Sequence, residues 1–168
     1  MAKPASNYVP EHMNTVTPHL VIAGAADAIE FYKKAFGAEE MHRMTGPDGR
    51  SIMHACVRIA GSPVFLVDEN PTYGVLGPEK QKGSPVFIHL FVKDVDAFAA
   101  KAEKAGAKVT MPPSDMFWGD RYGQLVDPFG HRWSVATHKQ ELTPDEIKQG
   151  MQKMMGEHEK KHGSKGAA

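Results

Sequence analysis

The chain has 168 residues, of which 41% are hydrophobic and 24% are charged, and this length and composition suit one compact domain with a core of its own. Twenty lysines and arginines balance twenty aspartates and glutamates, so no global field favours nucleic acid, anionic lipid or another polyanion. We therefore expect a small-molecule ligand, and neither nucleic acid nor a membrane as a partner.

The single cysteine, Cys56, cannot form an intramolecular disulfide. The N-terminal sequence MAKPASNYVPEHMNTV has no apolar run long enough for a signal peptide or a spanning helix. Both observations predict a cytoplasmic protein. Cys56 lies in the strand-like run IMHACVRIA, where a buried thiol is usually a small core residue and only rarely a nucleophile.

The first half of the chain predicts the element order βαβββ. TPHLVI is typical of a short strand, and DAIEFYKKAFG predicts an amphipathic helix with Ile29, Tyr32 and Phe36 on one face and Gly37 at its end. Three strand-like runs follow, AEEMHRMTG, RSIMHACVRIAG and SPVFLVDE. Turn residues at 46–49 and 61–63 separate these runs.

The second half repeats this order. It contains a strand PVFIHLFV, a helix DAFAAKAEKAGA, a strand around AKVTM, a proline-rich loop MPPSDMFWGD, and the strands RYGQLV and HRWSVAT. Residues 18–22 align with 88–92, and residues 27–38 align with 96–107 without a gap. Such self-similarity indicates an internal duplication, which is useful because one open sheet cannot cover its own apolar face.

We therefore predict an α+β fold in which two βαβββ modules, residues 15–70 and 84–138, form curled mixed sheets around a cleft. Together they make a single domain over residues 15–140, preceded by an N-terminal arm at 1–14. Thr143, Pro144 and Glu146 form a capping-box pattern, which predicts a C-terminal helix within 141–156 that ends near Met155. Residues 157–168 are polar and small, and predict a flexible tail.

The segments AIEFYKKAFGAEE, FWGDRY and DPFGHRWSVATH occur in an order that resembles the vicinal oxygen chelate superfamily. This superfamily groups glyoxalases, bleomycin-resistance proteins, fosfomycin-resistance proteins and extradiol dioxygenases. Within it the chain is most similar to the PhnB-like subgroup, over nearly all of residues 15–148. The resemblance implies the glyoxalase/bleomycin resistance fold, with a U-shaped cavity, often in a homodimer, and any metal ion lies in that cavity.

Metal-dependent members of the superfamily take their ligands from the first and last strands of each module. Matched through FYKKAFG and DPFG, these positions fall on Thr17, near Leu66, on Phe87 and on Ser134. A transition metal needs three or four imidazole, thiolate or carboxylate donors, which these residues do not supply. The resemblance thus implies no metal and no cofactor, with Ser134 available to hydrogen-bond a ligand.

Strand alternation leaves an alternative open. Side chains two residues apart on a strand point to the same face. The side chain of His19 therefore shares a face with Thr17, and that of His89 shares a face with Phe87. His54 is expected to face the same cavity. These imidazoles are either hydrogen-bonded residues of the cavity wall or a displaced site for a divalent metal such as zinc, nickel or iron.

The segment FWGDRYG mixes large apolar faces with polar groups, as ligand pockets do. In one interpretation Arg121 pairs with a carboxylate or phosphate of a ligand, while Trp118 stacks on an aromatic or cationic group and Tyr122 adds a phenol. In the other, Arg121 pairs with Asp120 and Trp118 fills the core.

Two further histidines are expected outside the site. The ring of His131 is placed at the surface or against Trp133. His138 is placed beyond the last strand, in solvent.

These inferences predict a homodimeric glyoxalase/bleomycin-resistance-like protein that binds a small organic molecule in the inter-module cleft without the usual metal. The predicted ligand-binding residues are His19, His54, His89, Trp118, Arg121, Tyr122 and Ser134. The alternative is a metal-dependent glyoxalase-type lyase or isomerase that uses His19 and His89. A third possibility is an interaction module that recruits a partner through its C-terminal helix. The sequence assigns no catalytic residue.

Overall fold

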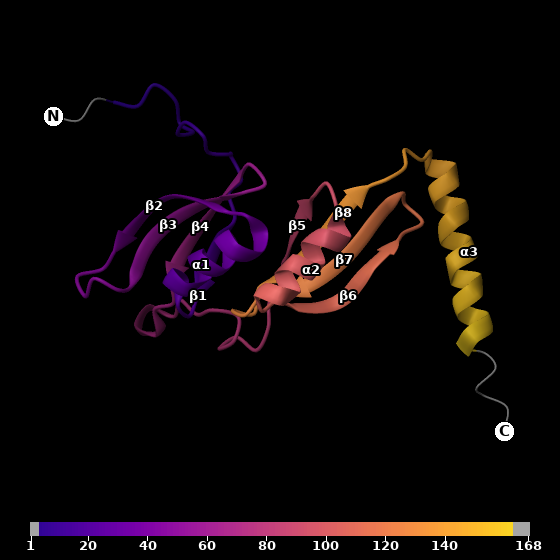
Figure 1. Cartoon of the computed structure of the whole chain (residues 1–168). Helices are drawn as coiled ribbons and strands as arrows, with labels where there is room; N and C mark the ends of the chain where they lie inside the picture. Colours follow the sequence, from indigo (N-terminus) through magenta and orange to yellow (C-terminus); the bar gives the residue numbers. More distant parts are fainter. Residues whose placement is uncertain (1–3, 163–168) are drawn as a thin grey trace.

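Two four-stranded sheets, each with one helix against it, form the body of the molecule, and a third helix follows at the C-terminus (Figure 1). The computed structural model describes residues 4–162. Among these residues, no helix is both long and apolar enough to cross a membrane.

The first module consists of β1 (His19–Ile22), α1 (Ala25–Phe36), β2 (Glu39–Thr45), β3 (Ile52–Ile59) and β4 (Ser62–Asp68). The second consists of β5 (Phe87–Phe91), α2 (Val95–Ala105), β6 (Lys108–Asp115), β7 (Asp120–Val126) and β8 (Arg132–His138). A short 3-10 turn, η1 (Pro71–Tyr73), lies in the linker, and α3 (Pro144–His162) ends the described chain.

Both sheets have the same topology, with strand orders β1-β4-β3-β2 and β5-β8-β7-β6. In each, the first strand runs parallel to the last, and the other neighbours are antiparallel. The predicted α+β class and the duplicated βαβββ modules are confirmed.

Helix α1 forms where the apolar spacing predicts it. Ile29, Tyr32 and Phe36 are buried on one face, and Gly37 ends the helix in the left-handed region at φ 68°, a conformation that favours glycine. The N-terminus of α1 is fixed from another element, because the Asp68 carboxylate at the end of β4 accepts hydrogen bonds from the backbone N–H groups of Gly24 and Ala25.

The modules meet through their helices. The Phe36 ring of α1 stacks on Phe98 of α2 at a centroid distance of 5.1 Å, and it meets Trp133 of β8 edge-on at 4.9 Å. Tyr32 also contacts the Trp133 ring, at 5.6 Å. Residues of both modules therefore share one hydrophobic core.

A buried carboxylate links the two modules within this core. Asp127 is 4% exposed. One of its oxygens accepts hydrogen bonds from the Tyr32 hydroxyl of α1 at 2.7 Å and from the Trp133 indole N–H at 2.9 Å. The other oxygen accepts from the backbone N–H groups of Phe129 and His131. Four donors thus compensate the cost of burying this charge.

Each sheet has one face against its helix and one open face. In β3, Ala55, Val57 and Ile59 belong to the core, whereas His54 and Arg58 alternate with them on the open face and are half-buried. This arrangement agrees with the face that strand alternation predicts for His54.

Two segments, the proline-rich stretch before β7 and the C-terminal helix, differ from the sequence prediction. The stretch predicted as a proline-rich loop contains Pro112 and Pro113 within β6, which is an edge strand with register shifts. Edge position and bulges accommodate proline, because the missing N–H is not needed by a second neighbouring strand.

The C-terminal helix is longer than predicted. The capping box at Thr143 and Glu146 is confirmed, with reciprocal hydrogen bonds between the two residues, but α3 continues to His162 instead of ending near Met155. The predicted tail 157–168 therefore begins inside the helix, and its residues 163–168 lie outside the described part of the chain.

Candidate functional site

The open faces of the two sheets carry pseudo-equivalent histidines on their first strands. His19 of β1 lies level with Phe65 of β4, and His89 of β5 lies level with Ser134 of β8. This register corrects two positions inferred from the sequence. Leu66 is fully buried in the core, so Phe65 takes its place on the open face. Phe87 lies level with Arg132, so His89, and not Phe87, shares a row with Ser134.

On the second module, an aromatic and polar group surrounds His89. We call it the His89 cluster, and it consists of His89, Phe91, Trp118, Tyr122, Gln124 and Ser134. The Nδ1 atom of His89 lies 2.8 Å from the Ser134 hydroxyl, with which it shares a hydrogen bond. This bond fixes the ring against β8 and directs the other nitrogen, Nε2, away from it.

Aromatic rings flank the His89 imidazole. Phe91 meets it edge-on at a centroid distance of 4.5 Å, and Tyr122 lies nearly parallel to it at 6.2 Å. Trp118 in turn meets Tyr122 edge-on at 5.7 Å. The Gln124 amide donates a hydrogen bond to the Tyr122 hydroxyl oxygen at 3.0 Å, so the phenolic proton remains available as a donor.

On the first module, three histidines and a phenylalanine form a second group, the His54 cluster of His19, His42, His54 and Phe65. The His54 ring lies 6.1 Å from His19, 5.3 Å from His42 and 4.8 Å from Phe65. Burial lowers the pKa of His54, and the neighbouring His42 and His19 imidazoles lower it further. His54 is therefore neutral at neutral pH.

Sequence reasoning missed His42 and Gln124. Both are brought to the open face by cross-strand pairing, His42 opposite Cys56 and Gln124 opposite Ser134. The pairing of β2 with β3 includes a register shift between Glu40 and His42, so simple alternation from the sequence does not place His42.

Arg121 lies on the opposite side of β7 from Tyr122. Its guanidinium forms a two-point ion pair with Asp96 of α2, at 2.6 and 2.7 Å, and a third contact with Asp115 at 3.2 Å. The hydrogen bonds to these carboxylates raise the pKa of Arg121, and Asp96 contributes more to this increase than Asp115 does. Arg121 therefore joins β7 to the helix and does not extend toward the His89 cluster.

Asp120 does not pair with Arg121, in contrast to one of the two sequence interpretations. Its carboxylate accepts a hydrogen bond from the Trp118 indole at 3.0 Å and lies 2.6 Å from Nδ1 of His138. His138 was expected beyond the strand, but it is the last residue of β8, and its side chain remains half exposed. The hydrogen bond with Asp120 raises the pKa of His138 above its usual value.

The N-terminal arm borders the first module's open face. A hollow of about 500 Å³ is lined by arm residues from Tyr8 to Thr15 together with Thr17, His19 and Phe65. Thr17 precedes β1, and its hydroxyl donates a hydrogen bond to the backbone carbonyl of Asn14. This hollow gives His19 one accessible side.

The donor chemistry does not fit the metal centre that some relatives carry. Phe65 has no donor atom, and Ser134 is a neutral hydroxyl bonded to His89. His19 and His89 belong to separate clusters. Within residues 4–156, whose side chains the structure describes, no group of three or more His, Cys, Asp or Glu side chains is arranged to hold a metal ion.

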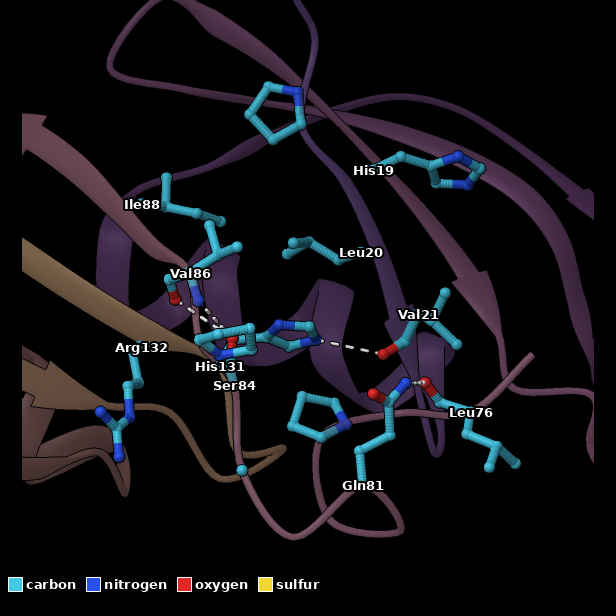
Figure 2. A pocket seen from close by; sticks show the side chains of 14 residues that line it. His19, Leu20, Val21, Leu76, Gln81, Ser84, Val86, Ile88, His131 and Arg132 are labelled. Carbon is cyan, nitrogen blue, oxygen red and sulfur yellow. Dashed lines mark hydrogen bonds between the residues drawn. The ribbon is translucent and has the colours of Figure 1, made fainter. Parts of the chain in front are cut away.

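A separate cavity of about 290 Å³, which we call the seam pocket, lies where β1 approaches the start of β5 and the linker (Figure 2). His131 lines it. This residue was expected at the surface or against Trp133, but its side chain instead reaches across to the other module. Its Nε2 donates a hydrogen bond to the backbone carbonyl of Val21 at 3.1 Å, and only 9% of the residue is exposed. Burial lowers the pKa of His131.

Comparison with known proteins agrees with this architecture. The family model of the glyoxalase/bleomycin resistance protein/dioxygenase superfamily matches residues 12–135. An uncharacterised protein of Mycobacterium tuberculosis is 47% identical over 139 residues, which cover 81% of each of the two chains.

Solved structures show the same fold. A gene product of Arabidopsis thaliana superposes with a TM-score of 0.60 at 29% identity, over 74% of this chain and 98% of the other. A PhnB protein from Bacillus cereus superposes with a TM-score of 0.57, over 74% of this chain and 99% of the other. Its identity of 16% supports similarity of fold alone.

Proposed function

Because the chain belongs to the glyoxalase/bleomycin resistance protein/dioxygenase superfamily, we propose that it binds a small organic molecule in the cleft of its paired modules, as a PhnB-like member without the usual metal. Membership of the superfamily determines the fold, whereas the binding or catalytic chemistry depends on the individual residues of the site. The His89 cluster is the part of the open surface that best supports this proposal.

The observation that best supports this proposal is a hydrogen-bonded pair of polar side chains, His89 and Ser134, flanked by aromatic rings. Ser134 holds His89 through Nδ1, and no hydrogen-bond partner for Nε2 occurs among residues 4–156, whose side chains the structure describes. The Tyr122 ring lies nearly parallel to the imidazole, Phe91 meets it edge-on, and 61% of Phe91 is exposed. A planar apolar ligand would stack there while a polar group bonds to His89 Nε2 or the Tyr122 hydroxyl.

Binding without a metal is part of the proposal, and the side-chain chemistry supports it. The two last-strand positions level with His19 and His89 hold a phenylalanine and a serine, so neither supplies the carboxylate or imidazole that would complete a transition-metal centre. The ligand is instead held by hydrogen bonds and stacking.

We also propose that the protein is a homodimer in the cytoplasm. Phe87 on the second module and Met44 on the first are large apolar residues that the single chain leaves exposed. Such exposed side chains on sheet faces favour coverage by a second copy. A reducing compartment suits the single, buried Cys56 thiol.

The test is a calorimetric and fluorescence screen of planar aromatic acids, amides and phenols against the full-length protein. Trp118 lies 5.7 Å from Tyr122, so a ligand at the His89 cluster should change tryptophan emission. We expect a His89→Ala variant to bind the best compound at least about tenfold more weakly, because a hydrogen-bond partner and a stacking face are both removed.

A matched control is available on the other module. His42→Ala also removes an exposed imidazole from an open sheet face, and it should bind the same compound with unchanged affinity. Equal affinity of the native and His89→Ala proteins would refute the assignment of the site to this cluster.

A further inference from the structure

The seam pocket is lined mainly by residues outside the His89 cluster and the His54 cluster, and His19 is the one residue that it shares with the His54 cluster. Leu20 of β1, Val86 just before β5 and Ile88 of β5 line it from both modules, and linker residues between Leu76 and Pro85 close another side. In Figure 2, Leu20 and Val86 face each other above His131, whereas Arg132 points away from the opening. None of its lining residues belongs to the His89 cluster.

The hydrogen bond of His131 determines which ring nitrogen carries the proton. A backbone carbonyl can only accept, so Nε2 must donate its N–H to the Val21 oxygen. In a neutral imidazole the other nitrogen, Nδ1, then has a lone pair and no proton. Burial of the ring favours this neutral form.

This acceptor has no partner among the side chains that the structure describes. Within residues 4–156, no hydrogen bond to His131 Nδ1 occurs. In the same part of the chain, every fully buried side-chain nitrogen or oxygen has a partner. Nδ1 is therefore accessible, although nine-tenths of the residue is covered, and the surface open to it is the pocket that His131 lines.

We propose that the seam pocket is a second ligand site, which takes a small, mainly apolar, neutral molecule that donates one N–H or O–H hydrogen bond to His131 Nδ1. The apolar body of the ligand lies against Leu20, Val86 and Ile88. The pocket does not depend on the ligand of the His89 cluster, so the two sites can be tested separately.

The volume limits the size of the ligand. A cavity of roughly 150 Å³ holds a benzene molecule, and pockets for drug-sized ligands begin at roughly 300 Å³. At about 290 Å³, the seam pocket suits a bicyclic aromatic compound. Indole has this size and a single N–H donor, and benzofuran has nearly the same shape with an oxygen in place of the N–H.

The test compares these two probes by two-dimensional amide NMR titration of the full-length protein. Indole should give saturable shifts centred on Leu20, Val86, Ile88 and His131. Benzofuran should bind at least about fivefold more weakly, because it leaves the His131 acceptor without a donor. Equal affinities for indole and benzofuran, or shifts centred elsewhere, would overturn the proposal.

A pair of variants separates blocked binding from misfolding. Replacing His131 also removes its hydrogen bond to Val21, so we choose Val86→Trp instead. Val86 is 61% exposed and lies outside the core, so the substitution should leave the fold intact. The indole ring of the new side chain should fill the pocket. Val75→Trp adds the same bulk to the linker outside the pocket. Indole should fail to bind Val86→Trp and should bind Val75→Trp as it binds the native protein; undiminished binding to Val86→Trp would also overturn the proposal.

Discussion

Removing the hydroxyl of Tyr32 should weaken the joint between the two modules. The perturbation is Tyr32→Phe, which keeps the ring against Phe36 and Trp133 and deletes only the 2.7 Å hydrogen bond to Asp127. Both partners are buried, so water cannot replace the lost donor. A hydrogen bond to a charged group contributes roughly 1.5–3 kcal/mol, and we expect a loss of that size in the free energy of unfolding.

Asp127→Asn should cost more, roughly 2–4 kcal/mol. The amide can keep one oxygen for the backbone N–H groups of Phe129 and His131, but its NH₂ group then faces the Trp133 indole N–H, a second donor. Since a domain of this size has roughly 5–15 kcal/mol of total stability, both single variants should still fold.

Urea denaturation followed by circular dichroism measures these losses. In the double variant that combines Tyr32→Phe with Asp127→Asn, the loss in the free energy of unfolding should be smaller than the sum of the losses in the two single variants. The difference, which is the coupling free energy, should be about 1 kcal/mol or more. The urea dependence of the unfolding free energy should be unchanged, because the surface exposed on unfolding is the same. If Tyr32→Phe lies within about 0.5 kcal/mol of the native protein, Asp127 does not hold the modules together through Tyr32.

Three further predictions use the same denaturation assay or hydrogen exchange. Burial, His42 and His19 lower the pKa of folded His54 below 6.5, so the unfolded chain binds this proton more readily and stability should fall as pH drops below 6.5. A His54→Gln variant should show a flatter pH dependence, and an unchanged slope would contradict the assignment. Gly119→Ala should destabilise by roughly 1–3 kcal/mol, because Gly119 has φ +97° and an added Cβ would overlap the Gln140 carbonyl oxygen; a neutral effect would contradict this. Thr143→Ala removes the α3 capping box and should cost about 1 kcal/mol locally, seen as faster amide exchange in the first turn of α3 with β8 unaffected; unchanged exchange in that turn would rule out the cap.

The sequence predicts the elements of this fold well because its signals are local. The face of Ile29, Tyr32 and Phe36 follows from helical spacing, and Gly37 marks the helix end through a conformation that few other residues adopt. The same local helix and strand patterns occur in each half of the chain, and they predict the duplicated order βαβββ. The two matching sheet topologies confirm this order.

The errors concern contacts that depend on register or on the second module. Pro112 and Pro113 were assigned to a loop, since proline usually breaks strands, but an edge strand with bulges accepts them. The bond from His131 to Val21 spans 110 positions of sequence, and no local pattern indicates it. Arg121 and Tyr122 are adjacent, and only the position of α2 shows that Arg121 faces Asp96 while Tyr122 faces the open side.

The candidate site was predicted in part. The sequence suggested that His19 and His89 point from equivalent strands, and the register places them level with Phe65 and Ser134. It did not indicate that His89 bonds to Ser134, or that His42 joins His54, because cross-strand neighbours depend on how far each strand is shifted against the next. Ligand-binding roles for these residues stay predictions.

The most direct test of the proposed function is calorimetric titration of the best compound from the screen into untagged protein whose metal content has been measured, before and after treatment with a chelator. The proposal predicts the same affinity in both samples, and weaker binding only in His89→Ala. Binding that disappears with the chelator and returns with one equivalent of zinc, nickel or iron would contradict it and would place a metal in the cleft.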